Sequence, residues 1–209
     1  MTPDLGQAVP TVPTWRLAIL PKCMNAEEVD CLRRRVDRNT PQGPRDDAIL
    51  LLLARRGLRA GAVVALSLDD LEWEAGALLV RRKGARPDRL PLPHKGGEAL
   101  ATDICQGRPP VTTRRVCVRM RAPRRGFANS QGIRTIVRRA LARAGLNPVL
   151  QGAPLLRPSL ATPWLQHGAS LTEIGELLRH QASATTRIYA QVDQGTFRAR
   201  ALPWPGGDA

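Results

Sequence analysis

The apolar run AILLLLA, at residues 48–54, is the feature that most limits how this chain can fold. It lies in a segment from Arg45 to Arg56 that holds no proline or glycine, and Gly57 follows it as a residue typical of helix ends. A helix that is apolar on all its faces is stable only when it is buried. The run is too short to span a bilayer, which takes roughly 20 apolar residues. The sequence therefore predicts a buried helix over residues 45–56.

Other helices are predicted on both sides of this segment. Asn25 and Glu28 have the spacing of a capping box, which predicts a helix over residues 27–38. A short helix is expected over residues 58–66, and a longer one over residues 96–106.

The later part of the chain also has helical spacing. Apolar residues predict a helix from Asn129 or Ser130 to Ala144. Pro158 is expected to begin the next helix, because a proline in the first turn removes no hydrogen bond. Pro163 falls inside the same apolar pattern and should kink that helix, at a cost of roughly 3 kcal/mol.

The last predicted helices lie near the only tyrosine of the chain. Ser170 and Glu173 form a second capping-box pair, ahead of a helix that begins at Leu171. After a bend, residues 185–192 should form the helix that carries Tyr189.

Two strands are predicted near the middle of the chain, over residues 77–82 and 89–92, and a turn with Lys83 at its tip joins them. A further short strand is expected over residues 115–118. The predicted fold class is α+β, mostly helical, with a small antiparallel β-sheet.

The charge points to a polyanionic partner. The net charge is +14, and only three of the 32 basic residues are lysines. Residues 104–172 contain no Asp or Glu but twelve arginines, and such a density of positive charge repels itself unless a polyanion neutralises it. Two plainer explanations stay open, which are a GC-rich genome that favours arginine and a solvated basic face without a specific partner.

The cysteines and aromatics narrow the classes of protein further. Four cysteines without paired short spacing fit neither a zinc site nor a disulfide framework, so we expect a reduced, cytoplasmic protein without a metal. Aromatic residues make up 3% of the chain, which disfavours recognition of single strands by base stacking.

Tyr189 is a candidate nucleophile, because a tyrosine oxygen can form a covalent enzyme intermediate. A buried tyrosine with a satisfied hydroxyl is the alternative explanation for this residue taken alone.

Three stretches resemble the catalytic domain of the tyrosine recombinases, or phage integrases. The stretch ARRGLRAGAVVALSLDDLEW resembles the family's first arginine box, and LLVRRKGARPDRLPLP resembles its lysine hairpin. The stretch LLRPSLATPWLQHGASLTEIGELLRHQASATTRIYAQVD resembles the second box through the nucleophile. Their order and spacing agree with the family over about residues 17–201.

The resemblance implies a role for each of five residues. Tyr189 would attack a DNA phosphate and form a 3′-phosphotyrosyl link. Arg59 and Arg157 would hold the non-bridging oxygens, and His180 would add a hydrogen bond to the phosphate. Lys83 would protonate the leaving 5′ oxygen. The resemblance implies no cofactor.

The resemblance also implies partners and a domain organisation. The partner would be double-stranded DNA, bound by a homo-oligomer (a tetramer on DNA) or together with a related recombinase. Residues 1–21 would be a linker or arm remnant, residues 22–200 the catalytic domain and residues 201–209 a tail, with the N-terminal core-binding domain absent. DNA contacts are expected from Arg81, Arg82, Arg124, Arg125, Arg134 and Arg138.

Three positions depart from the family pattern. Ala62 replaces an acidic residue, and Pro154 and Pro158 replace histidines. We expect from this an impaired or decayed recombinase, unless His167 or a water takes the place of the lost imidazole. The alternatives are a DNA-binding remnant without catalysis and a topoisomerase of the related type IB.

Overall fold

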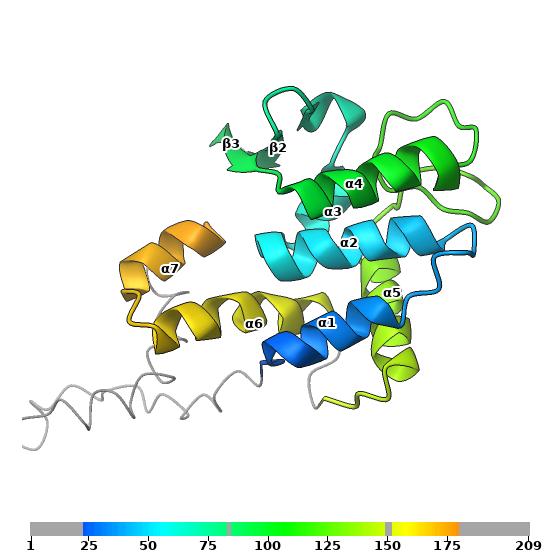
Figure 1. Ribbon diagram of the computed structural model, residues 1–209. Helices are drawn as coiled ribbons and strands as arrows, with labels where there is room; N and C mark the ends of the chain where they lie inside the picture. Colours follow the sequence, from blue (N-terminus) through cyan, green and yellow to red (C-terminus); the bar gives the residue numbers. More distant parts are fainter. Residues whose placement is uncertain (1–22, 83–84, 149–151, 180–209) are drawn as a thin grey trace, which may run out of the picture.

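A computed structural model describes residues 23–82, 85–148 and 152–179, and α2 (Gly43–Arg56) lies at its centre (Figure 1). All residues from Gly43 to Ala54 are buried. The helix packs against α1 (Ala26–Arg34), α4 (His94–Thr102) and α6 (Ala153–Gln166). It also contacts α3 (Ala60–Ala65) and α5 (Gln131–Arg143). The predicted buried helix is therefore confirmed.

The first helix ends earlier than predicted. Asn25 and Glu28 do form a capping box, but α1 ends at Arg34 instead of residue 38. The chain must reverse before α2, and it does so through a tight turn in which Gly43 packs on Asp37. A side chain at Gly43 would place its Cβ 2.1 Å from the main-chain oxygen of Asp37.

The predicted sheet is antiparallel and has three strands in the order β1-β2-β3: Leu71–Glu72, Ala77–Arg82 and Ala85–Pro91. The two-residue strand β1 was not predicted, and β3 begins four residues before the predicted start. The sequence had assigned residues 83–88 to the turn, but part of them extends β3, and Pro87 is tolerated there because β3 is an edge strand.

The helices predicted just before and just after the sheet are both present, with different bounds. The helix predicted over residues 58–66 is present as α3 (Ala60–Ala65). The helix predicted over residues 96–106 is divided into α4 and a π-helical turn at Asp103–Gly107. The strand predicted at residues 115–118 is wrong, since only isolated bridges join Ser67 to Arg115 and Val118 to Gly126.

In the last part of the described chain, α5 (Gln131–Arg143) matches its prediction closely. The expected start of the next helix at Pro158 is wrong, because α6 begins at Ala153 with Pro154 in its first turn and continues through Pro158 and Pro163. Burial of its apolar residues outweighs the cost of the two internal prolines.

The final described helix is α7 (Leu171–Leu178), and it begins with the predicted capping box of Ser170 and Glu173. It packs on α6 through a small separate apolar cluster that includes Leu165 and Ile174. The helix expected over residues 185–192 lies outside the described residues. No helix within the described ranges is long and apolar enough to cross a membrane.

A buried polar cluster holds the start of α2. The Arg45 guanidinium donates to Asp46 at 2.7 Å and to the Val118 main-chain oxygen at 2.9 Å. Asp103 is buried beside it, and burial raises the pKa of the Asp103 carboxyl to about 6, with Asp46 adding to the rise and Arg45 and Arg108 opposing it. The cluster therefore contains a carboxylate that is costly to ionise in the folded protein.

Truncation of the central helix should strongly destabilise the chain. Leu53 is fully buried, so Leu53→Ala removes apolar contacts and leaves a cavity, and we expect a loss of about 2–5 kcal/mol in the free energy of unfolding. Arg55→Ala is the matched control on the same helix. It removes only the exposed pair with Asp30, so it should cost about 1 kcal/mol or less in a urea titration. Equal losses for the two variants would contradict a core centred on α2.

The pKa of Asp103 predicts a pH dependence of stability. Between pH ~4 and ~6 the folded state binds this proton more tightly than the unfolded state, so ionisation of Asp103 lowers stability as pH rises through that window. We therefore expect Asp103→Asn to raise the free energy of unfolding at pH 7.5, by at most about 3 kcal/mol, and to have little effect near pH 4.

Asp69→Asn is the control for that pH series. The bond from Arg114 lowers the pKa of the Asp69 carboxyl, so its small contribution is present at neutral pH and is lost as pH falls. The two variants should therefore change stability in opposite directions at pH 7.5. A destabilising effect of Asp103→Asn at that pH would contradict the assignment.

Candidate active site

Arg157, on α6, bonds to the ends of α2 and α7. We call the place where Arg157, Gly57 and Leu178 meet the corner. Arg157 lies in the second turn of α6, and its guanidinium donates to the main-chain oxygens of Gly57 and, at 2.6 Å, of Leu178. Gly57 ends α2 in the left-handed conformation, and Leu178 ends α7. Gly57 and Arg157 are 100 positions apart in the sequence. The fold therefore brings the first arginine box and the second arginine box into contact.

Arg59 follows this corner directly. It is the residue before α3, two positions after Gly57, and its side chain is exposed. A side chain at Gly57 would meet Leu160 and Leu178 at 3.0 Å and would require an unfavourable positive φ, so glycine is needed for this close approach. Arg59 and Arg157, the two arginines predicted to hold the phosphate, therefore both belong to segments that meet at this corner.

The three other predicted catalytic residues, Lys83, His180 and Tyr189, lie outside the described residues. The segments that lead to two of them are described. β2 ends at Arg82, one position before Lys83, and α7 ends at Leu178, two positions before His180.

The residues expected to contact DNA are spread over several elements. Arg81, Arg124, Arg125, Arg134 and Arg138 are exposed, and the Arg82 side chain lies outside the described residues. Arg134, on α5, lies close to the start of α6, where a Cβ at Gly152 would be 3.2 Å from its Cγ.

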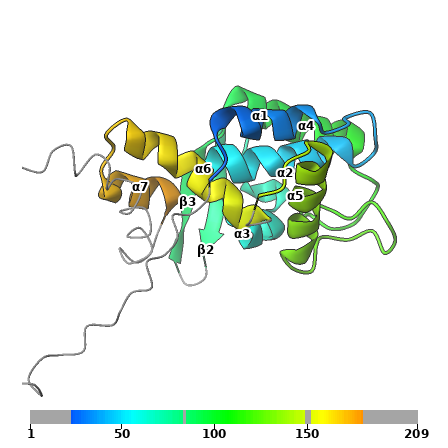
Figure 2. The ribbon, with the colours of Figure 1, turned by 90° about the horizontal axis from the view of Figure 1, so that it is seen from below.

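Arg124 and Arg125 are far from that corner. They lie on the connection between α4 and α5, which runs past the end of α2 opposite to α7 (Figures 1 and 2). The structure thus bonds Arg157 to the main chain two positions before Arg59, whereas Arg124 and Arg125 belong to a connection outside this corner.

The departures from the family pattern lie beside Arg157. Pro154 is exposed in the first turn of α6, Pro158 is half-buried, and Ala62 is half-buried on α3. None of these side chains can accept or donate a proton. None of the three therefore supplies a base beside Arg157.

His167 is not placed to substitute for the missing imidazole. It follows the last turn of α6, and its Nδ1 lies 2.6 Å from the Pro163 main-chain oxygen. It is ten residues beyond Arg157, which corresponds to roughly 15 Å along the helix axis.

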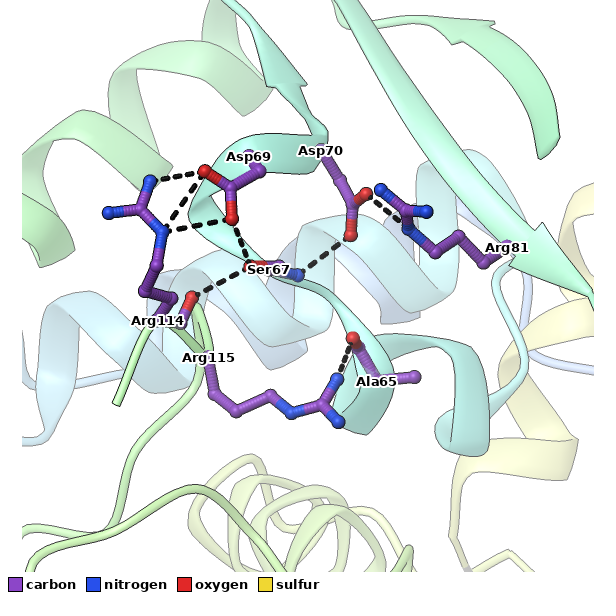
Figure 3. A network of polar contacts seen from close by, with 7 residues as sticks. All are labelled: Ala65, Ser67, Asp69, Asp70, Arg81, Arg114 and Arg115. Carbon is purple, nitrogen blue, oxygen red and sulfur yellow. Dashed lines mark hydrogen bonds and ion pairs between the residues drawn. The ribbon is translucent and has the colours of Figure 1, made fainter. Parts of the chain in front are cut away.

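A polar network around Ser67 and Asp70 was missed at the level of sequence, although the Ser-x-x-Asp spacing of a cap was visible (Figure 3). Asp70 is 1% exposed and accepts from the Ser67 main-chain N–H and from Arg81 Nε. Arg114 forms a forked pair with Asp69, which lowers the pKa of Asp69 and raises that of Arg114.

A cavity in the described part of the chain lies away from the candidate site. It has a volume of about 590 Å³ and lies between α1, α2 and the start of α4, and neither Arg59 nor Arg157 lines it. No group of three His, Cys, Asp or Glu side chains in the described ranges has metal-ligand geometry. The described part of the corner offers guanidinium donors, which suit phosphate oxygens.

The chain has close relatives among known proteins. It is 47% identical to y4rA, a candidate integrase/recombinase of Sinorhizobium fredii (strain NBRC 101917 / NGR234), over 99% of this chain and 50% of that protein. It is 32% identical to the tyrosine recombinase XerC of Oceanobacillus iheyensis (strain DSM 14371 / CIP 107618 / JCM 11309 / KCTC 3954 / HTE831), over 86% of this chain and 59% of that protein. The chain spans about half the length of y4rA and 59% of the length of this XerC.

Solved structures share the fold. The XerA recombinase matches with a TM-score of 0.72 at 20% identity, over 92% of this chain and 68% of that one. The XerH site-specific recombinase, in a post-cleavage complex with a palindromic difH substrate, matches with a TM-score of 0.73 at 23% identity, over 89% of this chain and 54% of that one. These likenesses establish a recombinase catalytic-domain fold, as the sequence predicted.

The sequence profile of the phage integrase family matches residues 22–195, which is most of the chain. The two arginine boxes that meet at Gly57 and Arg157 fall inside this match, and so do the lysine hairpin and Tyr189. The chain therefore belongs to the phage integrase family.

Proposed function

We propose that this chain breaks and rejoins double-stranded DNA at specific sites through a 3′-phosphotyrosyl intermediate. The observation that carries the proposal is the bonding of Arg157 to the main chain beside Arg59 and beside the segment that leads to His180. Three residues assigned to one phosphate thus belong to segments that converge. The family match and the recombinase fold support the same reaction.

The reaction is a transesterification, in which one phosphodiester bond is exchanged for another. The Tyr189 oxygen attacks the scissile phosphorus while its phenol proton passes to water, a phosphotyrosyl bond forms, and the bond from phosphorus to the 5′ oxygen breaks. Arg59 and Arg157 stabilise the charge that grows on the non-bridging oxygens, and His180 adds a hydrogen bond. Lys83 gives its proton to the leaving 5′ oxygen. A 5′ hydroxyl attacks the phosphotyrosine in the reverse sense, so rejoining needs no external energy source.

Double-stranded DNA is the proposed partner. The exposed arginines on β2, on α5 and on the connection before α5 would contact its phosphates, each contact releasing counterions. Several similar structures are of recombinases or integrases in complex with DNA. We propose further that the protein acts in the cytoplasm, as an oligomer on DNA or with a related recombinase, and that residues 22–200 form the catalytic domain.

The first prediction of this proposal concerns the nucleophile. On a suicide substrate that loses a short fragment after cleavage, the unmodified chain should form a covalent adduct that survives denaturing electrophoresis. Tyr189→Phe should abolish the adduct, because it removes only the attacking oxygen, and it should bind the same DNA within about twofold. DNA binding without any adduct, in every variant, would leave a DNA-binding remnant as the function.

The second prediction concerns the prolines beside Arg157. Pro154→His with Pro158→His restores two imidazoles, one of which can accept the Tyr189 proton, so adduct formation should accelerate by on the order of 10²-fold. The double variant should also be no less stable, because Pro158 lies inside α6.

The matched control for this pair is Pro154→Ala with Pro158→Ala. It relieves the same backbone restriction without adding a base. An equal acceleration by histidine and by alanine would show that backbone relief, and not proton transfer, had limited the reaction.

A further inference from the structure

The carboxylate of Asp70 is buried at the junction between the helix after Arg59 and the strand before Lys83 (Figure 3). One of its oxygens accepts from the Ser67 main-chain N–H at 2.9 Å, and the other accepts from Arg81 Nε at 2.8 Å. Ser67 lies two positions after the end of α3, and Arg81 lies on β2. One side chain therefore links two segments that would each carry a residue of the proposed reaction.

The sheet pairs the outer half of β2, residues 79–82, mainly on one side. On one side, β1 begins at Leu71, opposite Leu78, so within the described chain no strand pairs with residues 79–82 on that side. On the other side, the pairing with β3 changes register between Val80 and Arg82. Arg81 is the residue at this irregularity. Irregular pairing of this kind re-aims side chains and is frequent beside active sites.

The segment that carries Asp70 is in turn fixed from behind. Leu68 N–H donates to the Arg114 main-chain oxygen at 2.8 Å, and Val116 N–H donates to the Leu66 oxygen at 2.9 Å. The Arg115 guanidinium also bonds to the Ala65 oxygen at the end of α3. Asp70 is thus held on a supported turn, whereas the part of β2 that it contacts has fewer main-chain constraints.

The neighbouring carboxylate is arranged differently. Asp69 is exposed, and its partner Arg114 belongs to the connection after α4 and not to the hairpin. The two adjacent acids therefore allow a direct comparison, in which Asp70 accepts a hydrogen bond from Arg81 and Asp69 acts on Arg81 only through its charge.

We propose that Asp70 is a positioning residue, which fixes the outer half of β2 against the end of α3 and so sets the place of Lys83 relative to Arg59. This proposal rests on the proposed function. It assigns Asp70 no contact with DNA. Arg81 serves mainly as the partner of Asp70 through its Nε, although its side chain is 63% exposed and its outer nitrogens remain at the surface.

The test compares two suicide substrates. In one, the bond that breaks is an ordinary P–O5′ ester; in the other, sulfur replaces the 5′ oxygen. A thiolate leaves without a proton, because a thiol has a pKa near 8.5, whereas an alkoxide requires the proton of Lys83. A variant that only misplaces Lys83 should therefore be rescued by the sulfur substrate.

Asp70→Asn keeps the shape of the side chain and its bond to Ser67 but loses the charge that holds Arg81. On the ordinary substrate at saturating DNA, we expect adduct formation to slow by about 10- to 100-fold, and Asp69→Asn to stay within about twofold. On the sulfur substrate, Asp70→Asn should come within about threefold of the unmodified chain, as Lys83→Ala should. An equal defect on both substrates, or no defect on either, would overturn the proposal.

A second measurement does not depend on catalysis. Amide hydrogen exchange of the peptide covering residues 79–82 should become faster in Asp70→Asn and in Arg81→Gln, but not in Asp69→Asn, while exchange in α2 stays unchanged. Unchanged exchange in the hairpin overturns the positioning role, whatever the activity. If the unmodified chain reacts with neither substrate, the proposed function fails, and hydrogen exchange alone decides the role of Asp70.

Discussion

Burial of α2 on all sides is the constraint on which the other elements depend. Because the run at residues 48–54 offers no polar face, helices α1, α4 and α6 must cover it. Both ends of the helix then become organised places. Its start lies in the polar cluster of Arg45, Asp46 and Asp103, and its end at Gly57 leads into Arg59. The candidate site is thus fixed to the most deeply packed element of the chain, although its own residues are exposed or half-buried.

The positive charge of the chain divides between contacts inside the fold and the surface proposed to bind DNA. Part of the arginine excess in residues 104–172 is used internally: Arg108 donates to three main-chain oxygens, Arg114 pairs with Asp69, and Arg115 bonds to Ala65. Arginine suits this use, because one guanidinium reaches several oxygens at once. A count of basic residues therefore overstates the surface available to phosphate. Exposed arginines indicate that surface more directly than the total count does. Examples are Arg124 and Arg125 on the connection before α5, and Arg138 on α5.

The sequence predicted those features that are local or periodic. The buried helix, both capping boxes, the hairpin strands and α5 each follow from a pattern within one segment. It mispredicted features that depend on distant contacts. The start of α6 was predicted at Pro158, although the helix begins at Ala153. A helix can hold two internal prolines only when packing against other elements compensates for them, and this packing is not visible in the sequence of one segment. The link from Asp70 to Arg81 was missed for the same reason, since it joins a turn to an irregular place in a strand pair. For the candidate site, the family motifs predicted a shared role for Arg59 and Arg157, but only the fold supplied the carbonyls of Gly57 and Leu178 to which Arg157 bonds.

The prolines beside Arg157 show that fold and chemistry are separable in this chain. Pro154 occupies a first-turn position that proline suits well, and Pro158 is carried by the packing of neighbouring apolar residues such as Leu155 and Leu156. Loss of imidazoles at these positions therefore costs the helix little, and the bonds of Arg157 to Gly57 and Leu178 remain in place. Proton transfer has no such tolerance, because it needs an acceptor within hydrogen-bond reach of the phenol. The fold can thus keep the corner around Arg157 intact, while the rate of the proposed cleavage would depend on one or two side chains at the start of α6.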